Sequence, residues 1–325
     1  MQKFLTRFTR FVFSLALTTA LIAGGVEAAK TVNVGVCQLV EHPALDAANK
    51  GFVDGLAKAG FKTGVNLVID QQNAQADQSN LANIAHRFIS KKVDLICAIA
   101  TPAAQTMANA TDEIPIVGTA ITDYVTAKLA KSNEQPGSNV TGTTDMNPVE
   151  AQLDMLIKFV PDIKVIGTIY SSSEVNSQLQ IEILKTAAAK RGLQVKEATV
   201  STVNDIQQAA RSLIGKVQGI YVPTDNVVAS SVPTLLSITD EENLPVVAGE
   251  GSLVEAGCLG SVGIDYYQLG LQTGLMAADI LSGKSQPATM AIQGQKNCAA
   301  IVNMKALKNL GLKLPNEFKN AKKVG

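Results

Sequence analysis

The chain has 325 residues, of which 46% are apolar and 17% charged, and its 28 basic residues balance its 28 acidic ones. This composition excludes a disordered chain, and the absence of a basic excess excludes a surface suited to nucleic acid or anionic membranes. The length exceeds one comfortable hydrophobic core, so a body of two lobes is expected.

The first 28 residues predict a secretory signal peptide. Three basic residues precede an apolar run at 11–23, and small residues follow at the spacing of a cleavage site near Ala28. An uncleaved anchor is the alternative, although the run is shorter than the ~20 residues that a membrane span needs. No cysteine follows at lipid-attachment spacing. We therefore expect an exported, periplasmic protein whose mature part carries a formal charge of −2.

The mature chain is expected to begin with a strand, a polar loop and a helix. Apolar residues alternate with small or polar ones over 32–38, and helical spacing takes over after Asp46. Gln38, Glu41 and His42 occupy the loop. Ligands of open α/β sheets bind in the loops that follow the carboxyl ends of the strands, so this loop is a candidate binding segment.

The sequence contains an internal duplication of this strand, loop and helix pattern. Gly35 and Gly60 stand 25 positions apart, as do Gly167 and Gly192, and each pair spans a strand, a loop and a helix. Further strands are expected at 66–70, 93–100, 114–117, 194–199, 219–222 and 245–249. Alternating strands and helices require a parallel sheet with helices on both faces. We therefore predict an α/β fold of two doubly wound parallel-sheet lobes.

Three segments are expected to cross between the lobes and form a hinge, at 139–145, 261–267 and about 287–302. The predicted division is a signal peptide at 1–28, an N-terminal lobe of 29–144 plus 264–288, and a C-terminal lobe of 145–263 plus 289–325.

Polar residues gather at the expected strand ends of both lobes, which predicts a binding cleft. Thr101 before Pro102 has the form of a helix N-cap, and three serines precede the matching helix of the second copy. Both loops could hold a carboxylate or simply cap their helices. The predicted ligand-binding residues are Gln38, Glu41, Thr101, Thr122, Asp145, Ser171, Ser172, Ser173, Glu174, Asn176, Thr224, Asp225, Asn226, Glu250 and Asp265.

Several of these residues are carboxylates, and a closed cleft that buries them needs a cation. The α-ammonium group of an amino acid would supply it. The alternative is that Asp145 and Asp265 only tie the hinge to neighbouring backbone N–H groups, and that Glu41 caps its own loop.

Enzyme signatures are missing. The chain has no GxGxxG, GxxxxGK[ST], HExxH or GxSxG motif and only two histidines. His42 beside Glu41 suggests acid–base chemistry, but no nucleophile arrangement accompanies the pair. We predict a protein that is not an enzyme and that has no cofactor and no metal site.

The four cysteines show no metal spacing. In an exported protein thiols tend to pair, and Cys258 with Cys298 is the best candidate for a disulfide. Cys37 and Cys97 lie in apolar strands and are expected to be free, buried thiols.

A family resemblance extends over nearly all of the mature chain. Its motifs, in chain order, are VEHPALDAA, ATPAAQ, NVTGTTD, YSSSEVNS, VPTDNVVASS, GIDYYQLGLQTG and IVNMKALKNLGL. They resemble the periplasmic substrate-binding proteins of ABC importers of the tryptophan/tyrosine-binding type. The resemblance implies a type I periplasmic-binding fold, closure of two lobes on one ligand, and delivery to a membrane permease with its ATPase. It favours an aromatic amino acid as the ligand, and we expect a monomer.

One departure from the family pattern concerns the end of the fourth strand of the first lobe. Many relatives have Asp-Pro where this chain has Asp123-Tyr124, and Lys128 stands where a small residue is common. Tyr124 could stack on a planar ligand or cover the lobe surface.

The favoured hypothesis is an exported binding protein that closes on a small zwitterion. Thr101 and the serines at 171–173 would hold its carboxylate, and Asp225 with Glu250 or Asp145 would hold its ammonium. The alternatives are a sensing protein that presents its closed form to a membrane receptor, a binder of a nucleoside or sugar, and an exported enzyme. A cytosolic repressor is disfavoured because a signal peptide stands where a helix-turn-helix would be.

Overall fold

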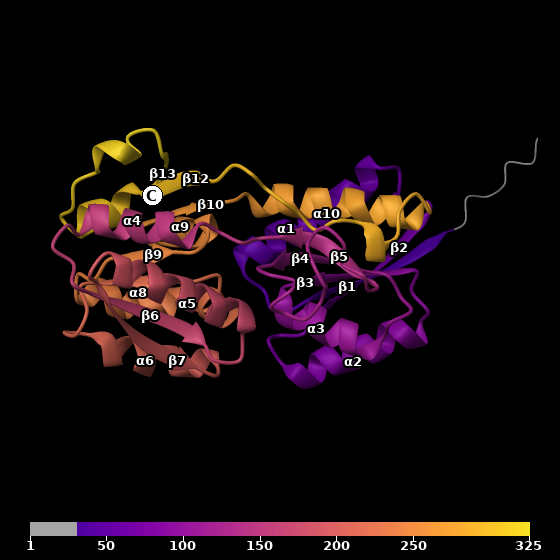
Figure 1. Cartoon of the computed structure of the whole chain (residues 1–325), viewed down its shortest axis with the longest axis horizontal. Helices are drawn as coiled ribbons and strands as arrows, with labels where there is room; N and C mark the ends of the chain where they lie inside the picture. Colours follow the sequence, from indigo (N-terminus) through magenta and orange to yellow (C-terminus); the bar gives the residue numbers. More distant parts are fainter. Residues whose placement is uncertain (1–30) are drawn as a thin grey trace, which may run out of the picture. The chain divides into compact units, whose positions relative to one another are not determined.

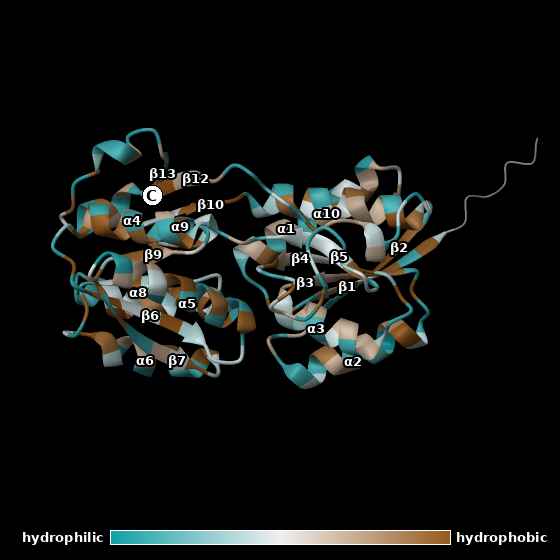
Figure 2. Cartoon of the chain, in the orientation of Figure 1, coloured by the Kyte–Doolittle hydropathy of each residue, from teal (hydrophilic) through white to brown (hydrophobic). Residues whose placement is uncertain are grey.

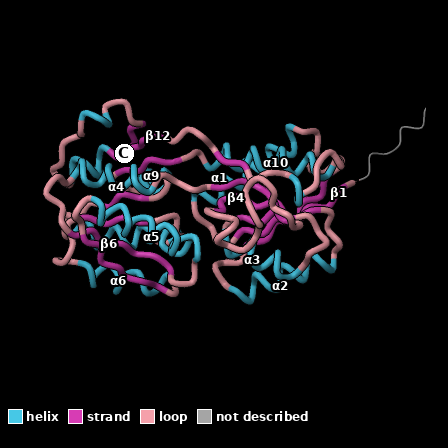
Figure 3. The backbone as a smooth tube through the Cα atoms, viewed as in Figure 1, coloured by secondary structure: helices cyan, strands magenta, loops and turns pink. Residues whose placement is uncertain are grey.

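The computed structural model describes residues 31–325, so the predicted signal peptide and its cleavage site lie outside the described residues. The described chain forms two α/β lobes, each built on one sheet (Figures 1 and 3). The predicted fold class is confirmed. No helix among these residues has both the length and the apolar character needed to cross a membrane.

The first lobe is built on a six-stranded parallel sheet. In spatial order its strands are β11 (Gln293–Gly294), β5 (Val140–Thr144), β4 (Ile116–Ile121), β3 (Leu95–Ile99), β1 (Val32–Gln38) and β2 (Leu67–Asn73). Four helices cover this sheet, one pair on each face (Figure 1). They are α1 (Pro43–Lys58) with α10 (Tyr266–Leu281), and α2 (Gln78–Ser90) with α3 (Thr101–Ala110).

The second lobe is built on a seven-stranded sheet in which β10 and β12 alone pair antiparallel. In spatial order its strands are β13 (Lys322–Val324), β12 (Ala299–Asn303), β10 (Gly260–Gly263), β9 (Val246–Ala248), β8 (Gly219–Val222), β6 (Val165–Ser171) and β7 (Gln194–Val200). Its helices are α4 (Val149–Phe159), α5 (Val175–Lys190), α6 (Ile206–Leu213), α7 (Asn226–Ser230), α8 (Val232–Glu241), α9 (Gly251–Glu255) and α11 (Met304–Asn309). Short 3-10 turns lie at Val203–Asp205, Pro287–Thr289 and Asn316–Phe318.

Hydrophobic residues concentrate on the strands and on the helix faces that cover them (Figure 2). One continuous core fills the first lobe. In the second lobe, α4 and α5 cover one core while α6 and α8 cover another. This packing fixes both sheets, and with them the loops at the strand ends.

The hinge consists of three crossing segments, at 145–148, 264–265 and 295–298. The third begins later than the predicted boundary at 288, because β11 pairs with β5 and so belongs to the first sheet. A two-residue strand carries no periodic pattern from which the sequence could reveal it.

Tyr124 is part of the first-lobe core. Its side chain is fully buried, and its hydroxyl donates to the carbonyl oxygens of Gly118 at 2.9 Å and Thr143 at 3.1 Å. A Cβ on Gly118 or Gly142 would lie within 2.6 Å of that hydroxyl, so the two glycines make room for it. Tyr124 therefore neither stacks on a ligand nor covers the lobe surface.

All four cysteines are free, so the predicted disulfide between Cys258 and Cys298 is wrong. Cys258 is buried in the turn between α9 and β10, whereas Cys298 is exposed in the third crossing segment. Cys37 and Cys97 are the free buried thiols that the sequence predicted. Burial raises the pKa of Cys37 to about 12, which keeps its thiol protonated.

Helices α1 and α10 pack backbone to backbone. A Cβ on Gly270 would lie 1.9 Å from the carbonyl oxygen of Ala48, and one on Gly274 would lie 2.3 Å from that of Phe52. The first residues of both helices reach the hinge side of the lobe, so this contact also fixes the site described below.

Gly274→Ala is expected to destabilise the protein by a net of about 1–2 kcal/mol. Backbone atoms cannot move aside for the added methyl group, which costs up to about 3 kcal/mol, and alanine regains roughly 1 kcal/mol in helix propensity. Urea unfolding measures the net change. Gly251→Ala is the matched control, since the nearest atom to its added Cβ would lie 3.6 Å away. Equal stability of the two variants would contradict this packing.

Candidate functional site

A small cavity lies where the carboxyl ends of both sheets meet. It is lined from the first lobe by His42, Leu45, Ala120, Thr122 and, at the start of α10, Tyr266. Asp145 lines it from the first crossing, and Thr224, Asp225, Asn226 and Glu250 line it from the second lobe. Its volume is about 10 Å³. A single water molecule needs ~10–15 Å³, so a larger molecule can enter only if the lobes move apart.

The two lobes touch across this cavity through polar side chains. His42 Nε2 lies 3.3 Å from Asn226 Oδ1, and its Nδ1 lies 3.8 Å from Glu250 Oε1. The hydroxyl oxygens of Thr122 and Thr224 are 3.4 Å apart. His42 Nδ1 is buried and makes no hydrogen bond. These long contacts can be exchanged for contacts to a ligand.

Asp145 is buried at the start of the first crossing and is held by both of its oxygens. Thr122 Oγ1 donates to Oδ1 at 3.0 Å, and the Tyr266 hydroxyl donates to Oδ2 at 2.7 Å. Burial, reinforced by the charge of Glu250, raises the Asp145 pKa to about 6, although the two hydrogen bonds oppose the shift. The carboxylate faces the cavity and has lone pairs to spare.

Asn147 joins the first two crossing segments. Its Nδ2 donates to the backbone oxygen of Asp145 at 2.9 Å, and its Oδ1 accepts from the backbone N–H of Ile264 at 3.2 Å. Asp145 thus both faces the cavity and belongs to the hinge, so the two expectations for this residue do not exclude each other.

Glu250 is the second buried carboxylate with capacity left. Among the described residues it accepts one hydrogen bond, from Ser252 Oγ at 2.9 Å. Burial raises its pKa, and only the nearby His42 and the Ser252 hydroxyl lower it.

Asp225 is already saturated. It accepts from the backbone N–H of Ser171 at 2.6 Å, from Ser177 Oγ at 2.7 Å and from the backbone N–H of Val228 at 2.9 Å. The last bond caps α7. Asp225 therefore holds the loop after β6 against the loop after β8. We call these two connected loops the frame of the cavity, and Asp225 lines the cavity as part of it.

Glu174 lies buried beside this frame. It accepts from the backbone N–H groups of Asn226 at 3.1 Å and Val227 at 3.3 Å, and from Asn176 Nδ2 at 3.0 Å. Burial, together with the charge of Asp225, raises the Glu174 pKa to about 8. Glu174 and Asn176 support the cavity wall without lining it.

Thr224 is positioned by Gln180, which sequence reasoning missed. Gln180 Nε2 donates to Thr224 Oγ1 at 2.6 Å, and Gln180 Oε1 accepts from the Thr224 backbone N–H at 2.9 Å. A polar residue within a predicted helix gives no signal of burial, so the sequence could not have marked it.

The other predicted residues lie outside the cavity. Gln38 is buried and binds Asp46 Oδ1 at 2.6 Å, which fixes the first loop. Thr101 is buried at the start of α3, and its hydroxyl has no partner. Ser171 is buried at the end of β6, where its backbone N–H donates to Asp225. Four others are exposed: Glu41, Ser172, Ser173 and Asp265.

The cavity also includes lining residues absent from the predicted set. The sequence marked His42 only as a residue of the first loop next to Glu41, and Tyr266 appeared only within a family motif. Leu45 lies one helical turn after His42, so helical spacing could have placed both on one face.

Backbone strain accompanies the site. Ala120 lines the cavity with φ of 55°, and Ala100 at the end of β3 has φ of 85°. Left-handed backbone of this kind costs an alanine about 1–3 kcal/mol and collects at functional sites. The register between β4 and β5 shifts between Gly118 and Ile121, so the bulge redirects the chain and brings Thr122 to Asp145.

Two lobes joined by three crossings around a polar cavity define a binding protein of the type I periplasmic class. The chain belongs to the ABC transporter substrate binding protein family, whose sequence model matches residues 33–324. The predicted resemblance is thereby confirmed.

The relatives include a tyrosine-binding protein of Clostridioides difficile, 46% identical over 256 residues that make up 79% of this chain and 74% of the relative. Among solved structures, the ABC domain in complex with L-Trp from Streptococcus pneumonia is 38% identical, with a TM-score of 0.88 over 91% of this chain and all of the other. A ligand-free, open substrate-binding protein with adhesive properties from Clostridium difficile is 46% identical, with a TM-score of 0.69 over 90% of this chain and 99% of the other.

Proposed function

We propose that this protein is the exported solute-binding component of an ABC importer, that it closes on an aromatic amino acid, and that it delivers this ligand to a membrane permease and its ATPase. The observation that carries the proposal is the cavity between the lobes. Buried carboxylates face it, and no lysine or arginine is among the residues that line it. Buried carboxylates favour a cationic group, which every amino acid provides as its α-ammonium.

The ammonium is best accommodated between Asp145 and Glu250. Both carboxylates face the cavity and retain acceptor capacity, whereas Asp225 already accepts three hydrogen bonds. Asp225 therefore takes the role of a frame residue in this proposal, and Asp145 replaces it as the main ammonium partner.

The ligand carboxylate would meet donors from both lobes. These donors are the His42 imidazole of the first lobe and the Thr224 hydroxyl of the second, whose present contacts across the cavity, to Asn226 Oδ1 and to Thr122 Oγ1, are long. A carboxylate placed between them would exchange those contacts for stronger charge-assisted hydrogen bonds. These groups take the place of Thr101 and the three serines, none of which lines the cavity.

The relatives support both the aromatic class and the closed arrangement. One of them is named for tyrosine binding and another was solved with L-Trp. The structure superposes better on the L-Trp complex than on the open relative, although the open relative is closer in sequence. Sequence divergence alone would give the opposite order, so the difference supports lobes that are closed here.

The test is a calorimetric and thermal-shift screen of the mature protein with L-tyrosine, L-tryptophan and L-phenylalanine against L-alanine, a nucleoside and a sugar. A ligand at 100 times its dissociation constant adds about 2.7 kcal/mol of stability. We expect this stabilisation from the aromatic amino acids. Stabilisation by the sugar or nucleoside alone would overturn the assignment.

Tyr266→Phe is expected to shift the pH dependence of ligand binding. The Tyr266 hydroxyl stabilises the ionised form of Asp145, and loss of a hydrogen bond to a charged group raises the Asp145 pKa by about 1–2 units. Affinity should therefore fall more at pH 6 than at pH 8, as titrations at both values would measure. Tyr267→Phe is the control, because that hydroxyl binds Asp54 instead. An unchanged profile would remove Tyr266 from the site.

A further inference from the structure

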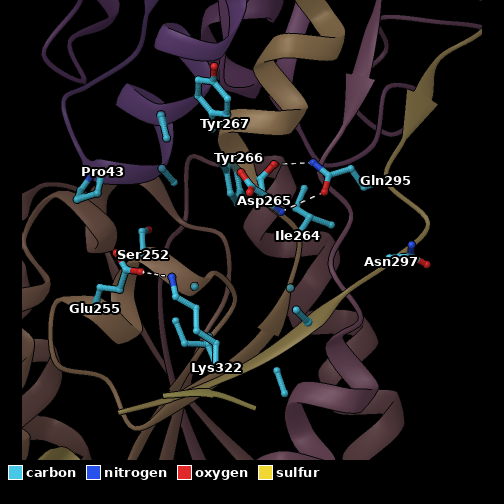
Figure 4. Close-up of a pocket in the computed structure, with 17 residues that line it drawn as sticks. Pro43, Ser252, Glu255, Ile264, Asp265, Tyr266, Tyr267, Gln295, Asn297 and Lys322 are labelled. Carbon is cyan, nitrogen blue, oxygen red and sulfur yellow. Dashed lines mark hydrogen bonds and ion pairs between the residues drawn. The ribbon is translucent and has the colours of Figure 1, made fainter. Parts of the chain in front are cut away.

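A second, larger cavity of about 360 Å³ lies beside the hinge (Figure 4). Sites for small molecules typically measure ~300–1,000 Å³, so this volume suffices for a compact organic molecule. The first residues of α1 and α10 wall it from the first lobe, and α9, β12 and β13 wall it from the second. Residues of the second and third crossings complete it.

The second cavity is separate from the first cavity, which lies between the lobes. At the start of α1, His42 and Leu45 face the first cavity, whereas Pro43, Ala44 and Ala47 face the second. A helix turns about 100° per residue, so these two sets lie on roughly opposite sides of α1. At the start of α9, Glu250 likewise faces the first cavity, whereas Gly251 and Ser252 face the second. Tyr266 is the one residue that lines both cavities.

The charge in this cavity is concentrated at Asp265. Lys322 and Glu255 form an ion pair at 2.7 Å, so their charges offset each other. Asp265 is held in place because its Oδ1 accepts from the backbone N–H of Gln268 at 3.1 Å. In addition, the side chain of Gln295 bonds both its backbone N–H and its backbone oxygen, as Figure 4 shows.

The remaining lining is largely apolar. Pro43, Ile264, Ile301 and Tyr266 are among the residues that line the second cavity. Ile264 and Tyr266 lie beside Asp265 (Figure 4). A fixed carboxylate at the edge of an apolar cavity is suited to a cation that carries a hydrophobic body.

We infer that this cavity is a second binding site, for a small organic cation with an apolar body whose ammonium group faces Asp265. Because both lobes and two crossings wall the site, a change in hinge angle changes its shape. A cation bound there shifts the balance between open and closed lobes, and by reciprocity it changes the affinity of the first cavity for its ligand.

Calorimetric titration of the mature protein, with phenethylamine as the probe, tests the inference. Saturable binding of one probe molecule is expected. Phenethyl alcohol, which lacks the charge, should bind at least about tenfold more weakly, because a hydrogen bond to a charged group contributes about 1.5–3 kcal/mol.

Three variants locate the probe. Asp265→Asn removes the charge while keeping an N-cap residue for α10, and Ala300→Leu fills the cavity from β12, so both should weaken probe binding by at least about tenfold. Asp145→Asn, which alters the first cavity, should bind the probe as the unchanged protein does. Loss of probe binding in Asp145→Asn with retention in Asp265→Asn would mean that the probe binds between the lobes, and this would overturn the inference. So would the absence of probe binding at any concentration. L-Tyrosine plays no part in this assay, so failure of the proposed function would not affect its outcome.

Discussion

Asp145→Asn is expected to weaken the binding of an aromatic amino acid by about tenfold to a hundredfold, because a hydrogen bond to a charged group contributes about 1.5–3 kcal/mol. The side chain is buried, faces the cavity and is oriented by Thr122 and Tyr266. Asparagine keeps the size and part of the hydrogen bonding, so the substitution removes mainly the charge that attracts the ammonium.

Calorimetric titration of the mature protein measures this effect. Asp279→Asn is the matched control, because that carboxylate is half exposed near the end of α10 and lies far along the helix from the cavity. Unfolding should be measured in parallel, since removal of a buried carboxylate is not expected to destabilise the fold. Equal affinity in the Asp145 and Asp279 variants would exclude Asp145 as the ammonium partner.

The affinity is also expected to depend on pH, falling about tenfold per unit below the raised Asp145 pKa and so about a hundredfold between pH 6 and pH 4. Burial raises this pKa from 3.8 to about 6. Below pH 6 the carboxyl of the free protein is protonated and must lose its proton before it can pair with an ammonium. Above pH 6 it is ionised, and the affinity should level off.

The same shift has the opposite sign for stability without ligand. Between pH 4 and pH 6 the folded protein holds a proton at Asp145 that the unfolded chain has lost, so this group makes the protein less stable as the pH rises through that window. Titrations from pH 4 to pH 8, with urea unfolding at each value, separate the two trends. Asp145→Asn should remove the contribution of Asp145 to the pH dependence of both the affinity and the free energy of unfolding. An affinity that rises toward acid pH would contradict the assignment.

These expectations describe a site in which polar contacts between the lobes stand where the ligand would be held. The His42–Asn226 and Thr122–Thr224 contacts are long, so they are weak and can be exchanged. A ligand that bridges the same groups gains stronger hydrogen bonds in the closed form than in the open form. That difference in affinity is what drives closure.

Local patterns in the sequence were sufficient to predict the architecture. Alternating strand and helix patterns, repeated between Gly35 and Gly60 and between Gly167 and Gly192, were enough to predict two parallel-sheet lobes. Topology then placed the polar loops at the carboxyl ends of both sheets. Local periodicity carries this information because secondary structure depends on near neighbours in the chain.

Which side chain of each loop faces the cavity depends on contacts between distant parts of the chain. Glu41 and His42 are adjacent, yet the first is exposed and the second meets Asn226 across 184 positions of sequence. Likewise, Tyr124 is a core residue because two glycines from different strands leave space for its hydroxyl. These outcomes depend on the rotation of helices and the register of strands that meet from distant parts of the chain, which no local pattern encodes.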